Sequence, residues 1–132
     1  MNFSRPILVE IAAGELIDKI TILQIKSERM QDSVKLQNVR QELDVLTPAR
    51  DELLPHSDAL TAATAELKRI NEGLWDIEDE LRGCERRQDF GARFTQLARS
   101  VYMTNERRAA VKRQINDLSG SRLVEEKSYA AY

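Results

Sequence analysis

Cysteine and histidine each occur only once in this chain of 132 residues, as Cys84 and His56. A single cysteine excludes a disulfide within the chain, and one cysteine with one histidine cannot supply the ligands of a structural zinc site in one subunit. A nucleophile activated by a neighbouring histidine is not expected either. The sequence therefore predicts no metal site, no cofactor and no catalytic residues.

Aromatic residues, glycine and proline are also scarce. Aromatics make up 5% of the chain, with five glycines and three prolines, whereas charged residues make up 32%. This composition favours helices over a β-sheet, because sheets are enriched in β-branched and aromatic residues. No apolar run is long enough to cross a membrane, and the first residues lack the layout of a secretion signal, so we expect a cytoplasmic protein without a membrane partner.

A strong charge of either sign is absent as well. Twenty basic and 22 acidic residues leave a formal net charge of −2. A protein that coats nucleic acid is normally clearly basic, so nucleic acid is an unlikely partner for this chain. The basic stretch from Arg107 to Arg113 is short, and neighbouring acidic residues offset it.

The residues that are present show the spacing of helices after Gly14. The first segment, up to Met30, is apolar over a wide face and is expected to be a central helix that contacts several neighbours. Its apolar positions are Leu16, Ile17, Ile20, Ile22, Leu23 and Ile25. The preceding segment, Pro6–Ile11, is rich in β-branched and aliphatic residues and is expected to be a short extended lead-in.

The middle of the chain contains several helix boundaries. Asp32 or Ser33 can cap a second helix, although a helix continuous with the first is also compatible with the sequence. Thr47 followed by Pro48 predicts the start of a further short helix, because proline is favoured at the first helical position. That helix is expected to stop near Pro55.

The most regular pattern in the chain follows a cap at Ser57 or Asp58. Apolar and small residues recur there at alternating steps of three and four, the heptad repeat of a helix that packs along one seam. The positions are Leu60, Ala63, Leu67, Ile70, Leu74, Ile77, Leu81 and Cys84. The repeat predicts one long helix.

A second long helix is expected after a reversal near Arg87–Gln88. It would be capped by Asp89, run from about Phe90 to Leu118 and end at Ser119–Gly120. The seam positions of this helix are Leu97, Val101, Thr104, Arg108, Val111, Ile115 and Leu118.

The predicted helices combine into one domain over residues 1–132, of which 119–132 form a C-terminal tail. Two long antiparallel helices and an apolar first helix predict an all-α fold, an antiparallel three- or four-helix bundle with a long central helical hairpin. A second subunit could also complete the long seam, so a homodimer is as compatible with the pattern as a monomer.

Polar residues interrupt the seam of the last helix halfway along. The predicted hairpin places Asn105 near Asn71, with Arg108 one turn away, and these side chains are expected to form one polar layer in which Asn71 and Asn105 pair. A buried amide or guanidinium is costly when unpaired, so such a layer would set the register of the helices.

The same layer could instead hold a small anion. In this interpretation Arg108, Lys112 and either Lys19 or Lys26 would bind a carboxylate or phosphate, and neighbouring polar side chains would supply hydrogen bonds. The candidate ligand-binding residues are Asn71, Asn105, Arg108, Lys112, Lys19, Lys26 and Glu78. The alternative for Lys19 and Lys26, which are seven residues apart on one helix face, is the solvent-exposed edge of the bundle.

Four segments of the chain are similar to an uncharacterised family of short bacterial and phage proteins, classed as a domain of unknown function. They are GELIDKITILQIK at Gly14–Lys26, LWDIEDELR at Leu74–Arg82, ARSVYMTNERRAAVKRQIN at Ala98–Asn116 and LVEEKSYAAY at Leu123–Tyr132. The resemblance implies a self-contained domain and brings no assigned activity, cofactor or site residues.

A second resemblance is to the fold of the all-helical chorismate mutases, through Glu15–Ile20, which looks like their first helix. The arginines and the glutamine that such a site requires do not occur here at matching spacing. The leading prediction is therefore a protein-interaction or structural module without catalysis, which associates with itself or with another protein. The alternative is a small-anion binding protein or enzyme, loosely similar to the chorismate mutases.

Overall fold

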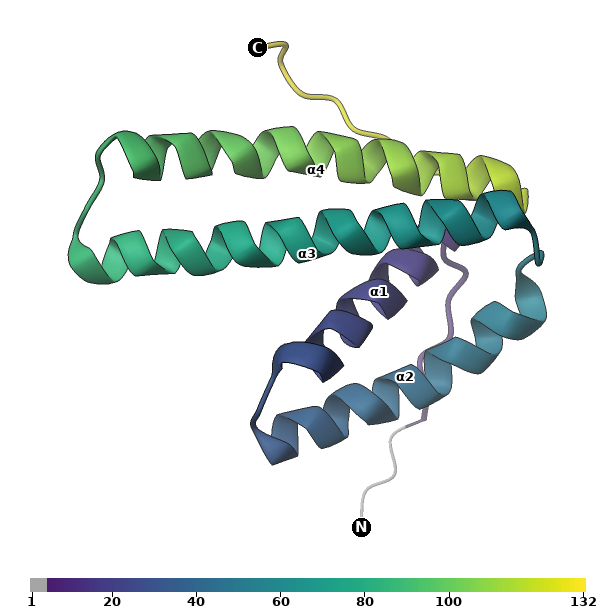
Figure 1. Ribbon diagram of the computed structural model, residues 1–132. Helices are drawn as coiled ribbons and strands as arrows, with labels where there is room; N and C mark the ends of the chain where they lie inside the picture. Colours follow the sequence, from purple (N-terminus) through teal and green to yellow (C-terminus); the bar gives the residue numbers. More distant parts are fainter. Residues whose placement is uncertain (1–4) are drawn as a thin grey trace.

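The computed structural model describes residues 5–132, so residues 1–4 of the predicted domain lie outside it. Within this range the chain forms four helices and no strand: α1 (Ala13–Arg29), α2 (Ser33–Leu53), α3 (Asp58–Arg87) and α4 (Ala92–Ser119). The predicted all-α fold with a long helical hairpin is confirmed. The hairpin is α3 and α4, which run antiparallel along their whole length (Figure 1).

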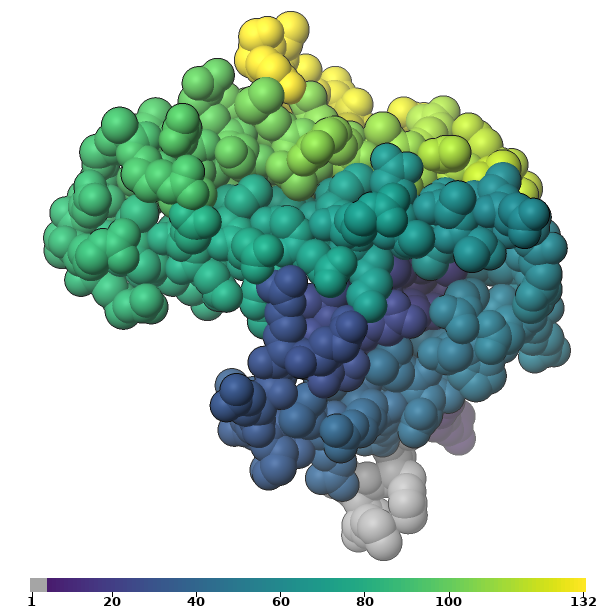
Figure 2. Space-filling model, in the orientation of Figure 1, coloured from purple at the N-terminus to yellow at the C-terminus, as the bar shows by residue number. Residues whose placement is uncertain are grey.

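Helix α1 occupies the central position that its wide apolar face predicts. It contacts α2, α3 and α4, whereas α2 contacts only α1 among the helices. The core lies where α1 meets the hairpin and includes Ile17, Leu67 and Ile115, which are 1% exposed or less. The other half of the hairpin projects past α1 and α2 (Figures 1 and 2).

The first and second helices are separate, and Asp32 explains the boundary. Its side chain accepts hydrogen bonds from the backbone N–H groups of Val34 and Lys35, both at 3.0 Å, as an N-cap does. Ser57 caps α3 in the same way by accepting from the N–H of Leu60 at 3.1 Å. The hairpin turns at Gln88, whose φ of 54° ends α3 in the left-handed conformation, and α4 ends at Gly120 with a φ of 65°.

Two predicted helix starts are wrong. Thr47–Pro48 does not begin a new helix, because α2 continues through Pro48 to Leu53. Residues on both sides of the proline pack against the body of the protein, Val39 on one side and Leu54 on the other, and this packing holds the helix together across the lost backbone hydrogen bond.

The second wrong start is at the hairpin turn. Asp89 does not cap α4. Its carboxylate instead accepts a hydrogen bond from the N–H of Gly91 at 3.1 Å, within the loop, and Gly91 occupies the N-cap position without a side-chain acceptor. The helix consequently begins at Ala92, two residues after the predicted start.

The N-terminus of α1 is attached directly to the end of α4. The backbone N–H of Gly14 donates to Asn116 Oδ1 at 2.7 Å, and the N–H of Ala13 donates to Ser121 Oγ at 3.3 Å. A Cβ on residue 14 would lie 2.4 Å from the carbonyl oxygen of Lys112, so only glycine allows this approach. This contact sets how α1 enters the bundle and where its next turn meets α4.

Candidate functional site

The polar layer predicted in the hairpin exists, and a carboxylate from α1 lies at its centre. Asp18 follows Gly14 by one helical turn and therefore faces the hairpin, where it is 2% exposed. Thr21 lies on the same face one turn later and is fully buried. Its hydroxyl donates to the backbone carbonyl of Asp18 at 2.8 Å, which leaves the Asp18 side chain to the other helices.

Three helices meet at the Asp18 carboxylate. Arg108 of α4 donates from Nε to Oδ1 at 3.0 Å and from Nη2 to Oδ2 at 2.5 Å, so the guanidinium and the carboxylate pair edge to edge. Asn71 of α3 donates from Nδ2 to Asp18 Oδ1 at 2.9 Å and to Thr21 Oγ1 at 3.0 Å. We call Asp18, Thr21, Asn71 and Arg108 the ionic layer.

The predicted pairing of Asn71 with Asn105 is not formed. Asn71 is buried and bonds to α1, whereas Asn105 is only partly buried and accepts a long bond of 3.5 Å from Arg108 Nη1. The charged Asp18 oxygens are stronger acceptors than an amide oxygen, which explains why Asn71 and Arg108 both turn toward α1. The seam pattern of the two long helices predicts contacts between α3 and α4 only, so it did not indicate that α1 would supply the acceptor.

Lys112 lies one turn beyond Arg108 and joins the edge of the ionic layer. Its Nζ is 2.8 Å from Glu15, 3.0 Å from Glu125 in the C-terminal tail and 3.8 Å from Asp18. Burial alone would lower the pKa of Lys112, but the hydrogen bonds to Glu15 and Glu125 outweigh it and raise the pKa above its ordinary value. The bonds to Asp18 likewise raise the pKa of Arg108, so both cations remain charged.

The structure does not bring all seven predicted residues together. Lys19 points toward α2 and pairs with Glu42 at 3.2 Å, with half of its side chain exposed. Lys26 is partly buried two turns further along α1 and forms no ion pair within residues 5–132. Glu78 is exposed and lines a cavity with Arg108 and Asn71 on the open side of the hairpin. Only Asn71, Arg108, Lys112 and Asn105 lie at or beside the ionic layer.

Asp18 and Thr21 are the residues of the layer that sequence reasoning missed as a site, and of the two Asp18 carries the clearer signal. It stands between Ile17 and Ile20 in a helix that is apolar over most of its surface, and a carboxylate in that position needs a buried partner. That signal was visible in the sequence. Its partner was not, because nothing in the chain relates residue 18 to residue 108 before α1 is packed against α4.

The chemistry of the layer is that of a structural ion pair. Two cations, Arg108 and Lys112, already face three carboxylates from Glu15, Asp18 and Glu125. An anion that entered between these paired groups would have to displace one of the carboxylates. The Thr21 hydroxyl and the Asp18 carboxylate are both buried and hydrogen-bonded within the layer, and this geometry favours register over binding.

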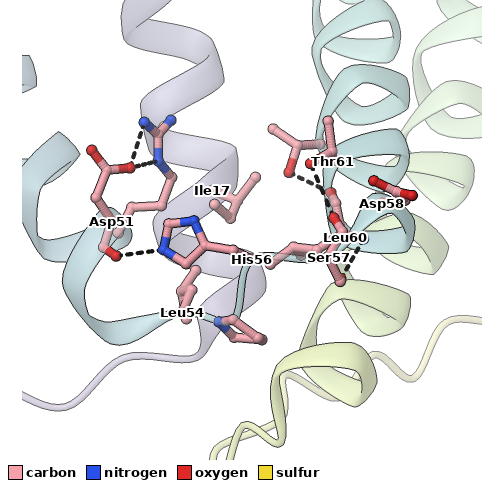
Figure 3. Close-up of a pocket in the computed structure, with 11 residues that line it drawn as sticks. Ile17, Asp51, Leu54, His56, Ser57, Asp58, Leu60 and Thr61 are labelled. Atoms are coloured by element: carbon pink, nitrogen blue, oxygen red, sulfur yellow. Dashed lines mark hydrogen bonds and ion pairs between the residues drawn. The ribbon is translucent and has the colours of Figure 1, made fainter.

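The only histidine of the chain lies at the turn between α2 and α3, in a cavity of about 450 Å³ that Ile17 of α1 also lines. Figure 3 shows the ring of His56 directed at the backbone of Asp51, whose carbonyl oxygen is 2.8 Å from Nε2. Ser57 is the N-cap of α3 and Asp58 points away from the ring in Figure 3. His56, Ser57 and Asp58 are therefore neighbours in sequence without the hydrogen bonds of a catalytic triad.

The acidic group Asp76, Glu78 and Asp79 has no metal-site geometry. Asp76 pairs with Arg29 of α1 at 2.6 Å. Over residues 5–132 no three His, Cys, Asp or Glu side chains converge in a way that could hold a metal ion. Over the same residues, no helix combines the length and apolarity that crossing a bilayer requires.

These observations define a small all-α protein whose central helix is aligned with a helical hairpin by one buried ion pair. The chain belongs to the family of unknown function DUF6165, which it matches over residues 7–132. The predicted membership in a family of unknown function is thereby confirmed. Neither a curated protein nor a solved structure matches the chain.

Proposed function

We propose that this protein is a protein-interaction module that associates with itself through the projecting part of its hairpin. We call this part, residues 77–101, the distal hairpin. The observation that supports the proposal is the incomplete burial of its heptad seam. Leu67, next to α1, is fully buried, whereas Ile77 and Leu81 farther along the same seam are only half-buried, although Cys84 and Leu97 nearer the turn are buried again.

Half-buried seam residues indicate a missing layer of helix. A helix packs its apolar stripe against other elements, and two helices alone cover only part of each other's stripes. In this protein α1, which α2 covers from the other side, supplies the further layer at one end of the hairpin only (Figure 1). A second copy placed with its hairpin antiparallel to the first would complete a four-helix bundle, a common symmetric arrangement.

A notch under the hairpin marks where the second copy would begin to pack. It is a cavity of about 320 Å³ at the end of α1, lined by Ile22, Ile25, Leu74 and Trp75 together with charged residues at its rim. In Figure 2 the molecule is hollowed between the projecting hairpin and α1 with α2. An apolar floor with a charged rim is typical of interaction surfaces.

Charge complementarity favours a second copy as the occupant. The distal hairpin carries acidic residues on α3, such as Glu78 and Asp79, and arginines on both helices, of which Arg82 and Arg99 form no ion pair within residues 5–132. In a contact with two-fold symmetry, each copy presents both acidic and basic side chains to the other, so opposite charges can pair. The net charge of −2 adds little repulsion between copies.

The experiment is to measure mass by analytical ultracentrifugation for the wild type and for Trp75→Glu. The proposal expects a dimer for the wild type and a monomer for Trp75→Glu, because a carboxylate in the notch cannot be buried at the interface. Far-UV circular dichroism verifies that the variant is folded. Met103→Glu is the matched control, since Met103 is 46% exposed and lines a cavity with the C-terminal tail instead of the notch.

A second control separates this surface from the N-terminal lead-in. Ile7 and Leu8 precede α1 and are 90% and 86% exposed, so they are another apolar surface. If Ile7→Ser with Leu8→Ser abolishes the dimer and Trp75→Glu does not, the interface is the lead-in and the proposal for the distal hairpin is wrong. A wild type that sediments as a monomer at all concentrations would also overturn it.

A further inference from the structure

The C-terminal tail and α4 line a cavity, open to solvent on one side, that the self-association proposal does not use. Its volume is about 540 Å³, within the range of roughly 300–1,000 Å³ that small-molecule sites occupy. The helix side of the cavity includes Tyr102, Asn105 and Arg108, and the tail side includes Lys127, Tyr129 and Tyr132. We call it the tyrosine cavity. It shares only Arg108 with the lining of the notch.

All three tyrosines of the chain line this cavity. Their rings are not used to fill the core, because Tyr102, Tyr129 and Tyr132 are 44%, 77% and 76% exposed. Tyr102 and Tyr132 meet edge to face with ring centres 5.3 Å apart, and the hydroxyl of Tyr132 donates to Glu106 at 2.5 Å. Oriented and exposed aromatic rings provide a surface on which a planar group can pack.

Arg108 supplies polar recognition on the helix side of the cavity. Its pair with Asp18 uses Nε and Nη2, while Nη1 makes only the 3.5 Å contact with Asn105. A guanidinium has five N–H donors, so donors remain on Nη1. The bond to buried Asp18 also fixes the plane of the guanidinium, which prepares it for a carboxylate or phosphate oxygen.

The remaining charges of the cavity favour an anion. Lys127 is the second cation of the lining, and its Nζ lies 5.7 Å from the ring centre of Tyr129 and 3.2 Å from Glu125, which is outside the lining and is shared with Lys112. Glu106 is the acidic residue of the lining, and its carboxylate already accepts the Tyr132 hydroxyl. The spare N–H donors of Arg108 on the α4 side of the cavity therefore face Lys127 and the rings of Tyr129 and Tyr132 on the tail side.

From these contacts we infer that the tyrosine cavity binds a small molecule that combines a planar ring with one carboxylate or phosphate group. The ring packs among the tyrosines and the anionic group accepts hydrogen bonds from Arg108, Asn105 and Lys127. Because one wall is the tail, the ligand also holds the tail against α4. The inference goes beyond self-association and does not depend on it.

The test is a titration of the full chain, carrying ¹³C-labelled tyrosine, followed by NMR with phenyl phosphate and benzoate as probes. We expect the three tyrosine ring signals to move together and to saturate with at least one probe. Inorganic phosphate lacks the planar ring and phenol lacks the anionic group, so each should bind at least about tenfold more weakly than the probe that saturates.

Variants assign the binding to this cavity. Tyr129→Ala removes an aromatic wall, and Arg108→Lys keeps a cation opposite Asp18 but removes the planar donors, so each should weaken binding at least about tenfold. Glu66→Gln, at an exposed position of α3 outside the lining of the cavity, is the control and should bind like the wild type. Tyrosine signals that do not move, that move without saturating, or that respond equally in Tyr129→Ala and Arg108→Lys would overturn the inference.

Discussion

At the scale of single residues, the pair of Asp18 and Arg108 does most to specify how α1 sits on the hairpin. The Asp18 side chain is 3% exposed and that of Arg108 is 29% exposed, so the carboxylate depends on its partner more than the guanidinium does. Removing one member of a buried ion pair is far more harmful than removing both, because the remaining charge stays buried without compensation.

Arg108→Leu should therefore destabilise the protein strongly, by about 3–5 kcal/mol, as a buried pair does when one partner is lost. Urea unfolding followed by circular dichroism measures the change.

The double variant Asp18→Leu with Arg108→Leu tests the cause. It should recover most of the stability lost in Arg108→Leu, and the interaction energy from the double-mutant cycle should be large and favourable. An Arg108→Leu protein as stable as the wild type would show that the pair contributes nothing to stability.

Gly14→Ala is a second prediction at this scale. The added Cβ would lie 2.4 Å from the Lys112 carbonyl oxygen and 3.0 Å from Asn116 Oδ1, so α1 must move away from α4. We expect a loss of about 1–3 kcal/mol, which is typical of overpacking. Gly73→Ala is the matched control. It meets no atom within 4 Å in the middle of α3, and thermal unfolding should show a gain of about 0.5–1 kcal/mol.

At the scale of elements, the C-terminal tail differs from the helices in how it is held. Beyond Ser121, side chains make its contacts with α4, and these include Lys112 with Glu125, Arg113 with Glu126 and Tyr132 with Glu106. Exposed ion pairs of this kind contribute little individually. The tail is therefore the element whose position responds most easily to pH.

Acid should release the tail. The hydrogen bond to Lys112, helped by Lys127, holds the pKa of Glu125 below its ordinary value of 4.5. A group with a lowered folded-state pKa stabilises the docked form above its ordinary pKa and loses that contribution as the pH falls through the lowered value. The NMR signals of Tyr129 and Tyr132 should accordingly become those of a free tail below about pH 4.5.

Glu125→Gln should weaken docking already at neutral pH and remove part of the acid transition. Glu126→Gln, which alters an outer pair with a 77% exposed carboxylate, should change the profile less. Tyrosine signals that keep their docked positions to the lowest pH at which the helices remain folded would contradict this account of the tail.

At the scale of the whole molecule, α1 packs on only one end of the hairpin, so under the proposed function the stability of the protein depends on dimer formation. If the distal hairpin is buried between two copies, the folded state is stabilised by mass action, and the unfolding temperature should rise with protein concentration. Trp75→Glu should remove this concentration dependence, whereas Met103→Glu should keep it. Calorimetry over a wide concentration range measures both, and a constant unfolding temperature for the wild type would argue against the dimer.

Most of the fold was accessible from sequence because helix periodicity and caps are local. The steps of three and four along α3, the cap at Ser57 and the stop at Gly120 each depend on a few consecutive residues. The errors at Thr47–Pro48 and Asp89 arose where a local signal competes with packing. Pro48 stays inside α2 because its neighbours pack on α1, and the turn between α3 and α4 uses Asp89 for its own loop.

Less of the candidate site could be predicted, for a physical reason. That Asn71 belongs to a polar layer follows from its position opposite Asn105 in the predicted hairpin, and its burial confirms that it faces the interior. Its partner comes from α1, and Lys19, on the same helix, turns away toward α2.

Residue periodicity sufficed to establish helices, their seams and one polar interruption, because these properties repeat along the chain. Which carboxylate meets Arg108, which part of the hairpin stays uncovered and where the three tyrosines gather depend on how α1 and the tail pack in space. Contacts between residues 90 positions apart, such as Asp18 and Arg108, have no local signature, because they exist only once the helices have docked.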